Sequence, residues 1–202
     1  MSIDTILLCF LHDISTGESC RSLSARFGIS VTTYDIYGRR LARLIIEHLV
    51  YEISYALSAS EAATQKYLFG RYYEQPEAVC AMDGVFVPRI APPKFGEAYY
   101  SGHKKAYGIK MLAVCDFNRK FIYINVGHTA RMGDSIVFRL SKFKRDIENG
   151  STVFNEDNKI LVDSAFADEL YLIKSTQRIE SGSVRVRIEH ALGNLKRCLG
   201  CF

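Results

Sequence analysis

Three acidic side chains stand in settings where a carboxylate needs a cationic partner. Asp83 lies inside an apolar run that has the pattern of a buried strand, and Asp163 directly follows a second such run. Glu189 lies in a stretch with helical periodicity, residues 184–199. Burying a carboxylate is costly unless a cation meets it, and carboxylate oxygens suit hard cations such as Mg²⁺ and Mn²⁺. If the three side chains converge, they form a site for a divalent cation.

Each of these residues also has a local structural explanation. Asp83 and Gly84 could form the tight turn of a hairpin between two apolar runs. Asp163 could cap a following helix. Glu189 could form a surface pair with Arg185, worth only about 0.3–0.5 kcal/mol. The metal site is favoured when the three acidic residues are taken together.

Asp134 is a fourth acidic candidate. It precedes an apolar segment with helical spacing, so an N-cap is its first interpretation. We therefore keep Asp134 as a supporting residue, outside the expected metal ligands.

Basic residues are concentrated in the middle of the chain. Residues 89–145 carry twelve Lys and Arg against three Asp and Glu, whereas residues 146–180 carry eight acidic and three basic side chains. This division suggests a surface for a polyanion, and ordinary solvated surface charge explains it equally well. The candidate phosphate contacts are His103, Lys104, Lys105, Arg185 and Lys196.

The N-terminal part has the pattern of a helix-turn-helix. Residues 3–14, 19–27 and 31–48 have helical spacing, with a turn at Gly28 and an N-cap at Ser30 between the second and third segments. In a docked motif of this kind, the third helix meets the bases. The near-balanced charge of residues 1–58, five basic and six acidic, favours the alternative of a plain three-helix packing unit. The candidate DNA contacts are Thr32, Thr33, Arg39, Arg40 and Arg43.

The second part of the chain is expected to form a sheet. Its strand patterns, in chain order, cover residues 79–87, 107–115, 121–126 and 159–162. One helix, starting after Gly133, separates the last two, and short helical stretches are expected after the fourth strand. Three antiparallel strands, a helix and a fourth strand that returns parallel to the first form the order of a ribonuclease-H-like sheet. Asp83 and Asp163 would then be neighbours.

Composition and cysteine usage indicate an ordinary globular protein. The chain has 202 residues, 48% of them hydrophobic and 24% charged, with a net charge of +4. The six cysteines are scattered, several of them in apolar runs, which is typical of reduced thiols in an intracellular protein. The apolar opening segment is too short to span a bilayer.

Six motifs follow the order seen in Harbinger-type transposases. They lie at residues 82–84 (Met-Asp-Gly), 100–108, 113–116, 133–135 (Gly-Asp-Ser), 162–166 (Val-Asp-Ser-Ala-Phe) and 187–196. The chain resembles this family, and the domesticated nucleases derived from it, over nearly its whole length. The segment from Thr16 is similar to the helix-turn-helix that precedes the nuclease domain there. One departure is Phe86, where the family usually has a histidine.

The resemblance implies a metal-dependent DNA endonuclease of ribonuclease-H fold whose acidic triad maps onto Asp83, Asp163 and Glu189. It implies two Mg²⁺ or Mn²⁺ ions as cofactors, DNA as the substrate and the nucleus as the place of action. A homodimer and a Myb-like accessory protein are further partners to test, and no membrane is expected. The stretch between Asp163 and Glu189 is short for the family. A catalytically inactive DNA-binding or scaffold protein of the same fold is therefore the alternative.

The expected fold class is mixed α/β. A helix-turn-helix-like helical domain is assigned to residues 1–58 and a connector helix to residues 59–78. A ribonuclease-H-like nuclease domain with a mixed sheet and flanking helices is assigned to residues 79–202.

Overall fold

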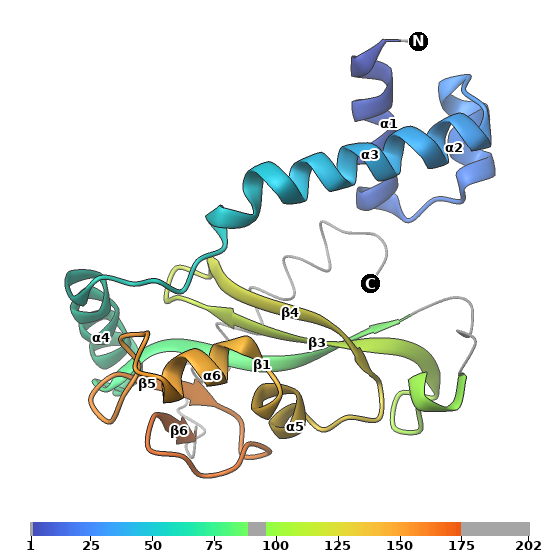
Figure 1. Ribbon diagram of the computed structural model, residues 1–202. Helices are drawn as coiled ribbons and strands as arrows, with labels where there is room; N and C mark the ends of the chain where they lie inside the picture. The colour runs from blue at the N-terminus through green and yellow to red at the C-terminus, as the bar shows by residue number, and fades with distance from the viewer. Residues whose placement is uncertain (1, 89–95, 175–202) are drawn as a thin grey trace. The chain divides into compact units, whose positions relative to one another are not determined.

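The computed structural model describes residues 2–88 and 96–174 (Figure 1). Within these residues the chain forms two compact units that divide between Glu52 and Ile53. The first unit is helical and the second holds the sheet. No helix in the described ranges is long and apolar enough to cross a membrane. The assignment of domains to residues 1–58, 59–78 and 79–202 stays a prediction.

Three helices make up the first unit: α1 (Ile3–Thr16), α2 (Cys20–Phe27) and α3 (Val31–Leu49), followed by the 3₁₀ turn η1 (Val50–Glu52). Each α-helix begins after a serine, Ser2, Ser19 or Ser30, whose hydroxyl accepts the N–H three residues later. Gly17 and Gly28 end α1 and α2 in the left-handed conformation, which glycine adopts without steric cost. The three predicted helices are confirmed.

The core of this unit is small. Cys9, Leu23 and Tyr34 contribute one buried side chain from each helix, with Phe27 and Ile29 packed against them. The Tyr34 hydroxyl donates a hydrogen bond to Asp13 and so joins α3 to α1. Because this unit has only a small apolar core, polar contacts between its helices contribute a larger share of its stability.

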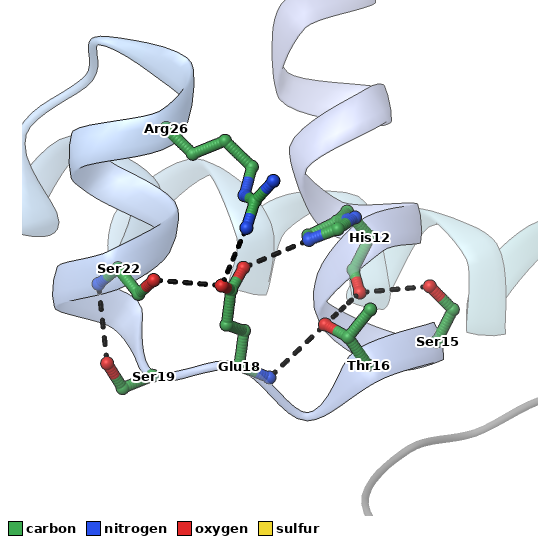
Figure 2. A network of polar contacts seen from close by, with 7 residues as sticks. All are labelled: His12, Ser15, Thr16, Glu18, Ser19, Ser22 and Arg26. Carbon is green, nitrogen blue, oxygen red and sulfur yellow. Dashed lines mark hydrogen bonds and ion pairs between the residues drawn. The ribbon is translucent and has the colours of Figure 1, made fainter.

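Glu18 is the main polar contact between α1 and α2 (Figure 2). Its carboxylate accepts hydrogen bonds from the Arg26 guanidinium at 3.0 Å and the Ser22 hydroxyl at 2.9 Å, and it lies 3.0 Å from the His12 ring nitrogen. These hydrogen bonds, that of Arg26 first, lower the pKa of Glu18 to about 2. The short connection between the two helices is therefore held by charge.

The second unit is built on a six-stranded mixed sheet. Its strands are β1 (Ala78–Pro88), β2 (Tyr100–Ser101), β3 (Ala106–Cys115), β4 (Phe121–Thr129), β5 (Lys159–Val162) and β6 (Leu172–Lys174). β3 pairs antiparallel with β1 and with β4, whereas β5 pairs parallel with β1. This is the strand order of the ribonuclease-H-like sheet that the sequence predicts, and all four predicted strands are present.

β6 is a strand that the sequence pattern did not predict, in a region where short helical stretches were expected. Residues 172–174 pair parallel with β5, in the register Leu161 to Ile173. The Ile160 N–H also donates to the carbonyl of Tyr171, which guides the chain into this pairing. The free edge of β5 thus outweighs the local helical pattern in this short segment, because strand pairing satisfies backbone groups that would otherwise be buried without partners.

Helices cover the sheet. α4 (Ala59–Tyr73) packs on β1, and its Gln65 side chain accepts the Phe117 N–H at 2.9 Å, which holds the turn between β3 and β4. α5 (Asp134–Arg139) and α6 (Lys142–Glu148) lie on one face of the sheet (Figure 1). A 3₁₀ turn, η2 (Gly96–Tyr99), precedes β2.

The single helix expected after Gly133 is wrong, because the segment forms two short helices. Ser141 interrupts it, since its hydroxyl accepts the Lys144 N–H and so caps a new helix. Because of this break, both helices face the same core, to which α5 contributes Val137 and Phe138 and α6 contributes Phe143 and Ile147. From the sheet, this core takes Cys80, Met82, Leu112, Val114, Ile160 and Val162.

Candidate active site

Asp83 lies in the middle of β1, opposite Ala113 of β3. The strand continues on both sides of it, so the hairpin alternative for Asp83 and Gly84 is wrong. The Gly84 N–H donates to Asp83 Oδ1 at 2.8 Å. Because side chains alternate along a strand, Asp83 points to the face opposite that of Met82 and Gly84. The carboxylate therefore lies on the side of the sheet away from the core beneath α5 and α6.

Asp163 directly follows β5. Its Oδ1 accepts the Ser164 N–H at 2.6 Å and the Ser164 hydroxyl at 3.2 Å. The Phe166 N–H donates to the Asp163 carbonyl at 3.2 Å, which closes a turn. No α-helix begins in residues 164–174, so the helix-cap alternative is wrong. The side chain holds the chain in a turn where it leaves the sheet.

The strand register brings Asp83 and Asp163 to matched positions. Ala81 of β1 pairs with Leu161 of the parallel strand β5, and each aspartate follows its strand's paired residue by two positions. Two residues along, a side chain returns to the same face of a strand. Neighbouring strands lie about 4.8 Å apart, so continuing this register beyond Leu161 would set Asp83 and Asp163 side by side.

Glu189, the third expected ligand, lies outside the described residues, as do Arg185 and Lys196. Among residues 2–88 and 96–174 there is no group of three or more His, Cys, Asp or Glu side chains that could hold a metal ion. Within that part of the chain the arrangement therefore provides two carboxylates, one on each of two parallel strands.

Asp134 does not have the capping role that its sequence context suggests. Gly133 occupies the N-cap of α5, and Asp134 is the first residue of the helix. Its carboxylate lies 2.8 Å from the Lys110 ammonium of β3, and both side chains are about four-fifths buried. Asp134 Oδ1 makes no directed hydrogen bond. The contact with Lys110 is thus an ion pair that lacks the geometry of a hydrogen bond.

The same carboxylate explains why glycine follows Asp83. A Cβ at position 84 would overlap the Asp134 carboxylate. Phe86, at the position where a histidine is usual in Harbinger-type proteins, is on this face too, and its ring covers Gly108. The Phe86 departure therefore falls on the side of β1 opposite Asp83.

Comparison with known proteins decides the family. A model of the DDE superfamily endonuclease family matches residues 82–202, more than half of the chain. The chain belongs to the DDE superfamily endonucleases. No curated protein and no solved structure matches it. The matched segment begins within β1, beside Asp83, and includes strands β2 to β6.

The donor set of Asp83 and Asp163 fits a hard divalent cation. Asp83 and Asp163 offer carboxylate oxygens, which are the ligands that Mg²⁺ and Mn²⁺ take in proteins. Asp83 comes from within a paired strand, and Asp163 comes from the turn directly after β5. Two such donors make part of a coordination shell.

The predicted phosphate contacts His103, Lys104 and Lys105 form the exposed turn between β2 and β3. The Ser101 hydroxyl accepts the Lys104 N–H at 3.2 Å, and Lys105 has a positive φ of 50°. All three side chains are exposed, so their charges are available to a polyanion.

The predicted DNA contacts of the helical unit lie along α3. Thr32 is exposed, whereas Thr33 contacts the capping Ser30 through its N–H and its hydroxyl. Arg39 lies 2.8 Å from Asp35, and Arg40 lies over the Tyr37 ring at 5.5 Å from its centre. Arg43 is exposed. The Asp35 carboxylate thus already balances the charge of Arg39.

Sequence reasoning missed two residues near the candidate site. Lys110 is the ionic partner of Asp134, and Ser135 accepts the Ala167 N–H at 3.2 Å. A lysine in the middle of an apolar strand was a usable signal for Lys110, because burial of an ammonium requires an acidic partner. No local pattern marks the bond made by Ser135, since its partner is 32 residues away.

Proposed function

We propose that this chain is a metal-dependent DNA endonuclease or transposase of the Harbinger DDE type that cuts phosphodiester bonds with two divalent cations. The observation that carries the proposal is the parallel register of β1 and β5, in which Ala81 pairs with Leu161, two residues before Asp83 and Asp163. Membership of the DDE superfamily endonucleases supports it. The order of motifs around Asp83, Asp163 and Glu189 favours the Harbinger type.

In this proposal, Asp83 and Asp163 bind the cations through their carboxylate oxygens and Glu189 completes the ligand set. When bound, Mg²⁺ or Mn²⁺ ions lower the pKa of an attacking water and stabilise charge on the phosphate oxygens. The chain's own residues hold the phosphodiester in place and keep the carboxylates pointing to one face. The attacking group is a water or a DNA 3′-hydroxyl.

DNA binding in this proposal involves both units. Lys104 and Lys105 contact backbone phosphates from the exposed turn, with His103 beside them, and Arg185 and Lys196 add contacts from the C-terminal segment. The start of α3, with Thr32 and Thr33, meets bases, while Arg39, Arg40 and Arg43 follow the backbone. A homodimer and a Myb-like accessory protein are partners to test by co-purification.

Nicking of supercoiled plasmid by the purified full chain tests the proposal. We expect nicking with Mn²⁺ or Mg²⁺ and none in EDTA. Asp83→Asn and Asp163→Asn each remove a direct ligand. Their loss of rate should exceed the about 10–100-fold typical of residues that only support a metal ligand. Asp168→Asn is the matched control, because Asp168 is in the same loop as Asp163 but is 90% exposed and paired with Lys174.

Two outcomes contradict the proposal. One is nicking that survives Asp83→Asn. The other is a chain that binds DNA equally well in EDTA, cuts nothing, and gains no thermal stability from Mn²⁺. This second result supports the alternative of a non-catalytic DNA-binding or scaffold protein.

A further inference from the structure

The beginning of α5 contacts β1, which carries Asp83, and the loop that follows Asp163. Asp134, its first residue, lies against β1 at Gly84, the neighbour of Asp83. Ser135, its second, bonds to Ala167 in the loop that follows Asp163. Two consecutive residues thus reach the surroundings of two aspartates that are 80 positions apart in the chain.

The contact at Gly84 is close and charged. The carboxylate of Asp134 fills the space that a side chain at position 84 would need. Lys110 approaches it from β3, at 2.8 Å from Oδ1, with 17% of its side chain exposed. The pair is largely buried, so moving the Asp134 carboxylate away would leave the Lys110 ammonium buried without a partner, which is costly. β1 is therefore held at the residue next to Asp83.

The contact at Ala167 holds the loop that follows β5. The Ser135 hydroxyl accepts the Ala167 N–H at 3.2 Å. One turn further along α5, the Phe138 ring packs edge-on against Phe166, with ring centres 6.3 Å apart. Phe166 in turn closes the turn that begins at Asp163. The loop is thus fixed against the same helix that holds β1.

We infer that Asp134 and Ser135 are positioning residues that set the separation of the Asp83 and Asp163 carboxylates. This inference rests on the proposed function. Metal ligands must be held to within about 0.5 Å of their working geometry. The direct pairing between β1 and β5 ends at Ala81 and Leu161. Beyond that point, the α5 contacts are a second connection between them, on the opposite face of the sheet.

The test compares Asp134→Asn and Ser135→Ala with Glu77→Gln in the full chain. Glu77 pairs with Lys159 at 2.6 Å and so joins the same two strands at their other ends. Glu77→Gln therefore removes a link between β1 and β5 without touching α5. The first measurement is the Mn²⁺ concentration that gives half-maximal nicking. We expect Asp134→Asn and Ser135→Ala to raise it about tenfold, the lower end of the effect of residues that orient metal ligands, and Glu77→Gln to leave it unchanged.

The second measurement needs no metal. Amide ¹H–¹⁵N spectra of the metal-free chain should show the Ser135→Ala change spreading from Ala167 to Ser164, whose N–H bonds to the Asp163 carboxylate. Asp134→Asn should move the Gly84 amide, which bonds to Asp83. A role confined to local stability predicts shifts that stop at the contacted residue and an unchanged Mn²⁺ requirement.

The outcomes separate the two proposals. A wild-type chain that neither binds Mn²⁺ nor cuts DNA defeats the proposed function. A wild-type chain that cuts, with both α5 variants requiring the same Mn²⁺ concentration as Glu77→Gln, overturns the positioning role alone. A tenfold higher requirement together with shifts at Ser164 and Gly84 supports it.

Discussion

At the scale of single residues, Gly84 shows how a small side chain serves a charged neighbour. Nothing in its own strand requires glycine, because it has ordinary strand pairing with Leu112. The requirement comes from Asp134, whose carboxylate occupies the space above the Gly84 backbone. Gly84 is therefore needed for a tertiary contact with Asp134 and not for a turn.

Gly84→Ala should therefore destabilise the chain. The added methyl group forces the Asp134 carboxylate away from Lys110, and overpacking of this kind costs about 1–3 kcal/mol. Urea unfolding followed by circular dichroism measures the change. Gly102→Ala is the control, because no atom lies within 4 Å of a Cβ there, and a surface substitution of this kind stays within about 0.5 kcal/mol. Equal stability of the two variants would contradict the crowding at Gly84.

Glu18 makes the stability of the helical unit depend on pH. The folded unit lowers the pKa of Glu18 from 4.5 to about 2. The stabilisation is thus fully present above pH 4.5 and is lost as the pH falls from there towards 2. In wild type, the thermal transition followed at 222 nm should shift downward across this window, and Glu18→Gln should reduce that shift. Glu47→Gln, on the exposed side of α3, is the control. An identical pH dependence in wild type and Glu18→Gln would exclude this role.

At the scale of elements, α6 connects parts of the second unit that are distant in sequence. The Lys144 ammonium binds Glu169 and donates to the Tyr171 hydroxyl at 2.9 Å, which joins α6 to the segment before β6. On the exposed side of the helix, Lys142 pairs with Asp146 at 2.5 Å. The two lysines have similar partners but different exposure, with 12% of the Lys144 side chain and 69% of the Lys142 side chain accessible.

This difference predicts unequal costs for the same substitution. Lys144→Met leaves Glu169 without its ammonium in a largely buried place and should destabilise by about 1.5–3 kcal/mol. Lys142→Met removes a surface pair and should cost less than about 1 kcal/mol. Denaturant unfolding of both variants provides the comparison. A cost for Lys142→Met that matches or exceeds that of Lys144→Met would contradict the importance of burial here.

At the scale of the whole molecule, the charge of the middle segment should appear in the salt dependence of DNA binding. Each phosphate contact neutralised contributes about 0.9 to the slope of log K against log salt concentration. Lys104→Gln with Lys105→Gln should therefore lower the magnitude of the slope by about 1.8 if both lysines contact phosphate. Fluorescence anisotropy with a labelled duplex in EDTA measures it without cleavage. Lys142→Gln is the control, since Asp146 already balances the charge of Lys142. An unchanged slope in the double variant would show that Lys104 and Lys105 do not contact phosphates.

Local patterns predicted most of the elements, because their causes lie within a few residues. The capping serines Ser19 and Ser30 and the turn at Gly28 were sufficient to outline the helical unit. The strand from residue 159 to 162 was predicted with the bounds it has. Predictions failed where the signal that was used competed with another signal, either distant or local. Asp134 had the position of a cap and instead meets Lys110, and Ser141 divides a helix that apolar spacing alone would continue.

The sequence by itself determined the three helices of the first unit, four of the six strands and the three acidic residues worth testing, since capping, periodicity and the cost of burying charge are properties of short segments. Only the tertiary structure decided the register of β1 and β5, which pairs Ala81 with Leu161, two residues before Asp83 and Asp163. A shift of one residue in this register would send every side chain of a strand to the other face of the sheet. The tertiary structure alone also decided that Asp134 lies behind Asp83 and not beside it. That arrangement depends on how β1, β3 and α5 pack together, and no spacing along the chain encodes it.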